Sequence, residues 1–307
     1  MSAPTTPVCY RHPSRETGVR CVRCDRPICP DCMNPASVGF QCPECVAEGR
    51  RTQRQARTAF GGSLSGQAGY VTKALIGLNL LAAVIGVVIA GIPTLIGNGL
   101  FTGVTAYQAM GAVTPFSFTL AATGELYQGA VPGIGTVFPG IDDGGFYRLV
   151  TAMFIHYGLV HLLFNMYALW QLGRQLETVL GPARFAALYL IAGLGGNVAV
   201  YLLDPGGLGA GASTALFGLF AGFFVILRRL GRDTSGIVAL LVMNVIITFL
   251  IPNLSWEGHI GGLVTGGVVA AALAYAPRER RTPVQVAGCA AVVLLLVVVT
   301  AARALTA

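Results

Sequence analysis

Long apolar runs, joined by short loops, restrict what this chain can fold into more than any other feature. A hydrocarbon core of about 30 Å is crossed by about 20 apolar residues in helical form. Charged residues make up only 11% of the 307 residues, too few for an ordinary soluble protein. We therefore predict an all-α polytopic membrane protein. Its transmembrane helices are expected at 71–92, 149–179, 185–203, 212–227, 236–251, 259–276 and 284–302.

The arginines in the loops predict the orientation of these helices. Arg148 and Arg303 fall on one side, and eight arginines fall on the other. Cytoplasmic loops carry the excess of basic residues, so the N-terminus is expected in the cytosol and the C-terminus outside. No apolar segment before residue 71 resembles a signal peptide. The eight are Arg174, Arg184, Arg228, Arg229, Arg232, Arg278, Arg280 and Arg281.

The composition divides the chain into four parts. Residues 1–49 are polar and rich in cysteine, and residues 50–70 are basic and then rich in Gly and Ser, which is typical of a flexible linker. Residues 71–276 would form a core of six helices with a long external loop at 93–147, and residues 277–307 a seventh helix. Arginine supplies nearly all the basic residues, and glycine and alanine are abundant. This composition favours a bacterial source and hence the bacterial plasma membrane.

Few polar side chains fall inside the apolar windows, and four of them are expected at one depth. Ser213 lies about 22 Å along its helix from Arg228, and His259 lies about 27 Å from Pro277. His161 and Asn165 are four residues apart on one helix face and bracket the depth of Ser213. Polar groups that meet inside a membrane are candidates for function.

Ser213 and His259 together could perform nucleophilic acyl transfer. A neutral imidazole can remove the hydroxyl proton and later protonate a leaving amine. No carboxylate is expected at this depth, so packing against Phe217 would orient the imidazole. His161 and Asn165 can donate hydrogen bonds without a fixed charge, which suits an oxyanion hole. His156 lies off that helix face and is interpreted as a loop-anchoring residue.

Three motifs in this region resemble the rhomboid intramembrane serine proteases: GASTALFG, the helix with His161 and Asn165, and HIGGLVTG. The resemblance covers roughly residues 140–276. It implies that Ser213 is the nucleophile, His259 the general base, and His161 and Asn165 the oxyanion side chains. It also implies six core helices, here followed by a seventh.

Two departures from the family pattern lie close to the expected site. Tyr147 and Arg148 resemble the family's Trp-Arg pair in the first external loop, with Tyr in place of Trp. Thr214 follows the serine where the family often has Gly. The resemblance also explains the overlong second window, because residues 148–157 would be a loop segment that dips into the membrane.

These features predict an endopeptidase that cleaves transmembrane protein substrates near the outer membrane face. The alternative is an inactive rhomboid-like protein that binds or escorts membrane proteins. The presence of both Ser213 and His259 favours the enzyme. A transporter is disfavoured because no helix carries a carboxylate in mid-membrane.

The N-terminal segment contains four pairs of metal-ligand residues. Eight ligands fill two tetrahedral zinc sites, and a reducing cytosol disfavours disulfides. We therefore expect two structural zinc ions and no cofactor for catalysis. Spacing alone leaves open whether neighbouring or alternate pairs share a metal. The pairs are Cys9 with His12, Cys21 with Cys24, Cys29 with Cys32, and Cys42 with Cys45.

The spacing of these pairs resembles the B-box type of zinc finger. By that resemblance the first and third pairs bind one zinc ion, and the second and fourth pairs bind the other. Five arginines and five acidic residues balance between residues 1 and 48, so the segment lacks the positive charge that nucleic-acid binding needs. A cytosolic protein is the expected partner.

Overall fold

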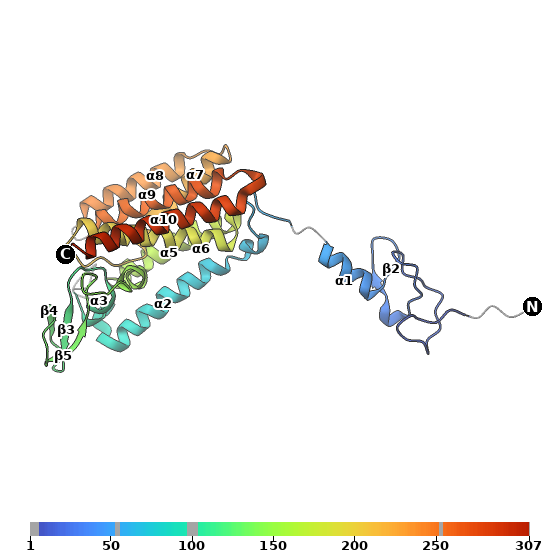
Figure 1. Ribbon diagram of the computed structural model, residues 1–307, viewed down its shortest axis with the longest axis horizontal. Helices are drawn as coiled ribbons and strands as arrows, with labels where there is room; N and C mark the ends of the chain where they lie inside the picture. Colours follow the sequence, from blue (N-terminus) through green and yellow to red (C-terminus); the bar gives the residue numbers. More distant parts are fainter. Residues whose placement is uncertain (1–5, 53–55, 97–103, 252–253, 307) are drawn as a thin grey trace, which may run out of the picture. The chain divides into compact units, whose positions relative to one another are not determined.

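The computed structural model describes residues 6–52, 56–96, 104–251 and 254–306. The chain forms two compact units, Met1–Ala56 and Arg57–Ala307. Figure 1 shows the second unit as a bundle of helices that carries a small sheet at one end. The first unit is a small domain with little regular structure beyond one helix.

The first unit has cysteines where a larger domain would have an apolar core. Its elements are a 3-10 helix, Pro30–Cys32, an antiparallel pair of two-residue strands, β1 (Asn34–Pro35) and β2 (Phe40–Gln41), and helix α1 (Pro43–Thr52). The buried apolar side chains are six cysteines and Ile28. A unit this small buries too little apolar surface to be stable without cross-links or metal.

The second unit contains a helix in each window that the sequence predicts to be transmembrane. The fold is mostly helical, as predicted. The helices are α2 (Tyr70–Ala90), α3 (Ala106–Gly111), α4 (Arg148–Thr151), α5 (Leu159–Leu180), α6 (Pro182–Leu203), α7 (Ser213–Arg229), α8 (Ser235–Leu250), α9 (Trp256–Tyr275) and α10 (Arg281–Ala304).

The helices differ in their ability to cross a membrane. Among the described residues α2, α6, α9 and the segment Arg278–Ala304 are long and apolar enough, and the helices of the second window form a bent pair. Residues Arg148–Phe154 and Leu159–Leu180 meet at an angle of 91°. Gly158 stands at the break with φ of 94°, which glycine adopts without strain. Helices α7 and α8 have 17 and 16 residues and are shorter than a full crossing.

Glycines allow helices α6, α7 and α9 to pack closely at the centre of the bundle. A methyl group placed on Gly266 would lie 2.3 Å from Cα of Gly218, and one on Gly262 would lie 1.9 Å from the carbonyl oxygen of Thr214. Small residues at such crossings bring two backbones together. These contacts bring the helices that carry Ser213 and His259 close together.

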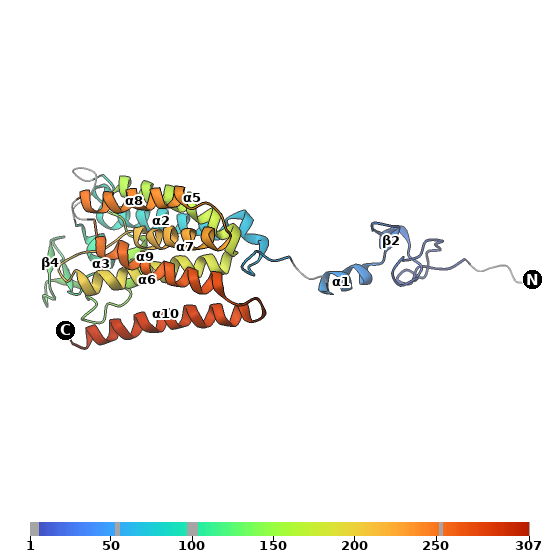
Figure 2. The ribbon, with the colours of Figure 1, turned by 90° about the horizontal axis from the view of Figure 1, so that it is seen from above.

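Helices α2, α8 and α10 lie at the periphery and expose apolar side chains. Figure 2 shows α10 along one side of the bundle. The exposed apolar residues include Val88 on α2, Leu250 on α8 and Leu294 on α10. In a multi-pass membrane protein such surfaces face lipid.

The long loop after α2 contains a small sheet, a difference from the all-α prediction. Strands β3 (Phe118–Ala121), β4 (Leu126–Gln128) and β5 (Gly135–Phe138) pair antiparallel in the order β4-β3-β5, with Phe118 opposite both Gln128 and Phe138. The sequence analysis predicts only a long external loop at 93–147. The buried guanidinium of Arg148 holds β5 to α4 by donating to the carbonyls of Phe138 and Pro139, at 3.3 and 2.7 Å, and it also donates to the carbonyl of Ala112 at 2.9 Å.

Residues 57–69, predicted as part of a flexible linker, are instead packed against the helices. Phe60 is buried in the main core, and a 3-10 helix covers Leu64–Ala68. A methyl group on Gly62 would lie 1.9 Å from the carbonyl oxygen of Leu180. The glycines of this segment therefore serve close packing rather than flexibility.

The carboxylate of Glu177 fixes the beginning of α2. It accepts hydrogen bonds from the backbone N–H groups of Val71 and Thr72, both at 2.9 Å, and from the Thr72 hydroxyl at 2.8 Å. The side chain is fully buried. The first N–H groups of a helix have no partner within the helix, and a carboxylate there also meets the positive end of the helix dipole.

We predict that Glu177→Ala destabilises the protein by about 3 kcal/mol, because three buried donors lose their acceptor. The measurement is thermal unfolding of the purified protein in detergent. The control is Glu279→Gln, which changes an exposed carboxylate between α9 and α10. An equal midpoint for both variants would contradict the role assigned to Glu177.

Candidate functional site

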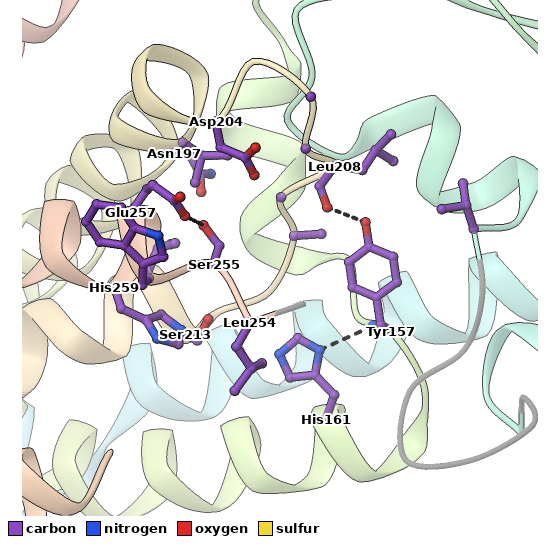
Figure 3. A pocket seen from close by; sticks show the side chains of 18 residues that line it. Tyr157, His161, Asn197, Asp204, Leu208, Ser213, Leu254, Ser255, Glu257 and His259 are labelled. Carbon is purple, nitrogen blue, oxygen red and sulfur yellow. Dashed lines mark hydrogen bonds between the residues drawn. The ribbon is translucent and has the colours of Figure 1, made fainter. Parts of the chain in front are cut away.

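A cavity of about 660 Å³ opens among helices α5, α6, α7 and α9. Ser213, His259 and His161 line it together, and Figure 3 shows their side chains around the same space. The structure thus brings together three of the four site residues predicted from the sequence. The fourth, Asn165, lies one helical turn from His161 and is not among the lining residues.

Ser213 begins α7 directly after a tight backbone segment. Gly211 has φ of 130°, and its N–H donates to the carbonyl of Ala152 at 2.9 Å. A methyl group on Gly211 would lie 2.9 Å from Nε2 of His161 and 3.4 Å from Oγ of Ser213. Only glycine leaves this space open between the imidazole and the hydroxyl.

His259 is held by two side chains from different helices. Its ring stacks on Phe217 with centroids 4.1 Å apart and planes 11° from parallel, so the expected ring contact is present. Its Nδ1 lies 2.7 Å from Oγ1 of Thr248 on α8. The Thr248 hydroxyl donates its one proton to the Asn244 carbonyl at 2.8 Å and therefore accepts from Nδ1–H. This leaves Nε2 of His259 as the unprotonated nitrogen.

His161 has the opposite tautomer. Its Nδ1 accepts from the backbone N–H of Tyr157 at 3.3 Å, so the proton of the neutral ring is on Nε2. Nε2 is the atom that lies beside Gly211, on the side of the serine. Asn165 is buried, and its Nδ2 has no hydrogen-bond partner among the described residues. Both side chains can therefore donate a hydrogen bond.

His156 anchors the backbone just before Ser213. Its Nε2 accepts from the N–H of Ala212 at 3.5 Å, and Nδ1 donates to the carbonyl of Phe154 at 3.3 Å. Its ring also meets the edge of His161, with centroids 5.0 Å apart. The predicted loop-anchoring role of His156 is confirmed, and the loop that it anchors is the one leading into α7.

Thr248 is the site residue that the sequence analysis missed. A threonine within an apolar helix most often bonds to its own backbone, and Thr248 does so through its proton. No spacing in the sequence connects it with His259, because the contact depends on how α8 packs against α9. Thr248 is one of only two buried residues of α8.

Two carboxylates, Asp204 and Glu257, line the cavity at the ends of α6 and α9. Burial and then the charge of Glu257 raise the pKa of Asp204 above its ordinary value. Neither carboxylate is hydrogen-bonded to a histidine among the described residues.

In the first unit the eight metal-ligand residues form two groups of four. All ligand atoms within a group lie within 4.8 Å of one another. Nδ1 of His12 is 3.2 Å from Sγ of Cys29 and 3.5 Å from Sγ of Cys32. Such spacings suit tetrahedral coordination with bonds of about 2.0–2.3 Å. The groups are Cys9, His12, Cys29 and Cys32, and Cys21, Cys24, Cys42 and Cys45.

Four thiols of these groups have pKa values that are shifted in opposite directions. Burial opposes ionisation, but backbone N–H groups outweigh it and lower the pKa of Cys9 and of Cys21 to about 6. Burial and neighbouring thiols raise the pKa of Cys32 to about 11 and that of Cys45 to about 12. A divalent cation would allow all thiols of a group to ionise together.

Comparisons with known proteins agree with this geometry. A family model of the Rhomboid domain matches residues 143–276. The putative rhomboid protease YdcA of Bacillus subtilis is 34% identical over 189 residues, which cover 59% of this chain and 93% of that protein. The rhomboid protease GluP of Bacillus subtilis is 40% identical over 138 residues, which cover 43% of this chain and only 27% of that protein. RHOMBOID-like protein 5 of Arabidopsis thaliana is 33% identical over 135 residues, or 41% of this chain and 43% of that protein.

Proposed function

This chain belongs to the rhomboid family, and from that premise we propose that it is an intramembrane serine endopeptidase with Ser213 as nucleophile and His259 as general base. The observation that carries this proposal is the orientation of His259. Thr248 accepts its Nδ1–H, so the lone pair of Nε2 is available to take the proton of a hydroxyl group.

The first chemical step would form an acyl-enzyme. The Ser213 oxygen attacks the scissile carbonyl while Nε2 of His259 takes its proton, and the same imidazole then protonates the leaving amine. Nε2–H of His161 and Nδ2 of Asn165 would donate to the oxyanion. The open space beside Gly211 supports this arrangement, since it borders both the serine oxygen and Nε2 of His161.

The second step would return the enzyme to its starting state. A water molecule attacks the acyl carbonyl, His259 removes its proton, and the ester bond to Ser213 breaks. Water would reach the site through the cavity, whose rim carries Asp204 and Glu257. With the basic loops in the cytosol, this rim faces outward, and cleavage would take place near the outer membrane face of a bacterial plasma membrane.

The substrate would be a transmembrane protein whose helix is weak near its outer end. The peptide bonds of a regular helix are hydrogen-bonded and shielded, so helix-weakening residues would let the chain extend into the cavity. The short helix α7 supports a submerged site, because its 17 residues span about 25 Å of a ~30 Å core.

We further infer that the first unit binds two structural zinc ions and recognises a cytosolic protein. The thiol-rich interior supports the metal, since zinc would replace the missing apolar core. Salt bridges neutralise the arginines Arg11, Arg15, Arg20, Arg23 and Arg26, which supports a protein partner rather than a nucleic acid.

For the catalytic pair, we predict that Ser213→Ala and His259→Ala each abolish cleavage of a reporter transmembrane substrate in proteoliposomes. The double variant should be no worse, because the two residues act as one unit. Ser235→Ala, an exposed serine at the start of α8, serves as the control and should retain activity. A serine-reactive fluorophosphonate should label Ser213. Folded protein that is not labelled there would favour the inactive binder instead.

For the orientation of the base, we predict that Thr248→Val lowers kcat roughly 10-fold with little change in KM, because the imidazole loses the acceptor that fixes its tautomer. Thr248→Ser should restore most of the rate, since it keeps the hydroxyl. Thr300→Val is the matched control, because among the described residues the Thr300 hydroxyl is bonded only to the Leu296 carbonyl of its own helix. A Thr248→Ser variant as slow as Thr248→Val would count against the hydroxyl.

For the metal sites, elemental analysis of the purified full chain should give two zinc ions per molecule. Cys21→Ser with Cys24→Ser removes half the ligands of one group and should reduce the count to one. The control is Cys289→Ser, a cysteine in α10 outside both groups. A count of two in the double variant would contradict the grouping.

A further inference from the structure

Three arginines from separate parts of the second unit gather around Gly61. Arg57 belongs to the turn before α2, Arg184 to the first turn of α6, and Arg281 is the first residue of α10. A methyl group on Gly61 would lie 3.5 Å from Nη2 of Arg184 and 3.6 Å from Nη1 of Arg281. These two nitrogens are therefore at most about 7 Å apart. The charges of Arg57 and Arg281 both act on Arg184.

Neutral acceptors hold the three guanidinium groups in place. Arg57 donates to the carbonyl of Gly61 at 3.2 Å, and Arg281 donates to the carbonyl of Ala59 at 3.0 Å. Arg184 donates from Nε to the side-chain oxygen of Gln285 at 2.7 Å. Each guanidinium has five N–H donors, so these contacts position the groups and leave most donors available.

No carboxylate in the described residues neutralises this group. The five arginines between residues 11 and 26 of the first unit are a direct contrast, because each lies within 4.0 Å of an acidic side chain. The described residues of the second unit contain no such pair. Like charges this close repel, and the repulsion is stronger where side chains are partly removed from water. A countercharge from outside the chain would relieve it.

We propose that Arg57, Arg184 and Arg281 form a binding site for a phosphate group, supplied by the headgroup of an anionic phospholipid. Arginine pairs with phosphate through parallel N–H donors at about 2.7–2.9 Å. One phosphate can bridge guanidinium nitrogens that are about 7 Å apart, because its own oxygens separate the two contacts. A single headgroup would thus tie the turn before α2 to the beginnings of α6 and α10.

The surroundings of the site favour a lipid over a soluble phosphate. The exposed apolar residues Val284 and Val286 follow Arg281 within two turns of α10 and offer a surface for acyl chains. The site also lies at the end of the bundle with the basic loops, opposite the sheet of β3, β4 and β5 (Figure 1). Basic residues next to helix ends attract anionic lipids.

The test measures lipid retention by the intact protein. Wild-type protein, Arg184→Gln with Arg281→Gln, and the control Arg228→Gln with Arg232→Gln would be titrated with phosphatidylglycerol in detergent and observed by native mass spectrometry. The control removes the same charge from two exposed arginines, one in the last turn of α7 and one in the α7–α8 connection. We expect wild type and control to bind alike and the site variant at least 10-fold more weakly. Equal binding by the two double variants would overturn the proposal.

Two further measurements distinguish a lipid from a soluble phosphate and provide for a site variant that does not fold. In one outcome, inorganic phosphate stabilises the wild type as strongly as phosphatidylglycerol does and leaves the unfolding temperature of the site variant unchanged. In that case the ligand is a soluble phosphate, and the lipid proposal is wrong. If the double site variant does not fold, Arg57→Gln takes its place, since Arg57 is exposed and its one described side-chain bond is to the Gly61 carbonyl. Undiminished lipid binding by Arg57→Gln would then overturn the three-arginine site. Peptidase activity enters none of these measurements, so the outcome is separate from the proposed catalytic function.

Discussion

The close contact of helices α7 and α9 is the constraint on which the site depends. Gly262 and Gly266 of α9 lie against the backbone of Thr214 and Gly218 of α7. Ser213 is one residue before the first contact, and His259 is three residues before Gly262. A larger residue at either glycine would separate the helices and with them the serine and the imidazole. Thr214 contributes its carbonyl here, so the side chain that replaces the family's glycine is compatible with the crossing.

The three histidines of the site differ in role because their neighbours fix different tautomers. His259 donates from Nδ1 to a hydroxyl, His156 accepts at Nε2 from Ala212, and His161 accepts at Nδ1 from Tyr157. His259 therefore presents a lone pair at Nε2, His156 holds the backbone before Ser213, and His161 presents a donor at Nε2. No carboxylate is needed to obtain this division, which suits a region where a buried charge is costly.

The sequence is sufficient to predict features that depend on local order along the chain. Apolar windows located the helices, and helix length brought Ser213, His259 and His161 to one depth. Contacts between elements that are distant in sequence could not be predicted from it. Thr248 reaches His259 through the packing of α8 on α9, and Glu177 caps α2 across 106 residues. The strands of the long loop are short, and in none of them do apolar and polar residues alternate strictly along the strand.

The two units are stabilised by different kinds of interaction. The helical unit can expose apolar surface to lipid and use glycines to bring backbones into contact, so its polar groups are concentrated at the cavity and the helix ends. In the first unit, thiols occupy the interior in place of an apolar core. Loss of the proposed zinc ions should therefore unfold the first unit locally and leave α2 to α10 intact, since residues 57–69 are packed with the helices of the second unit.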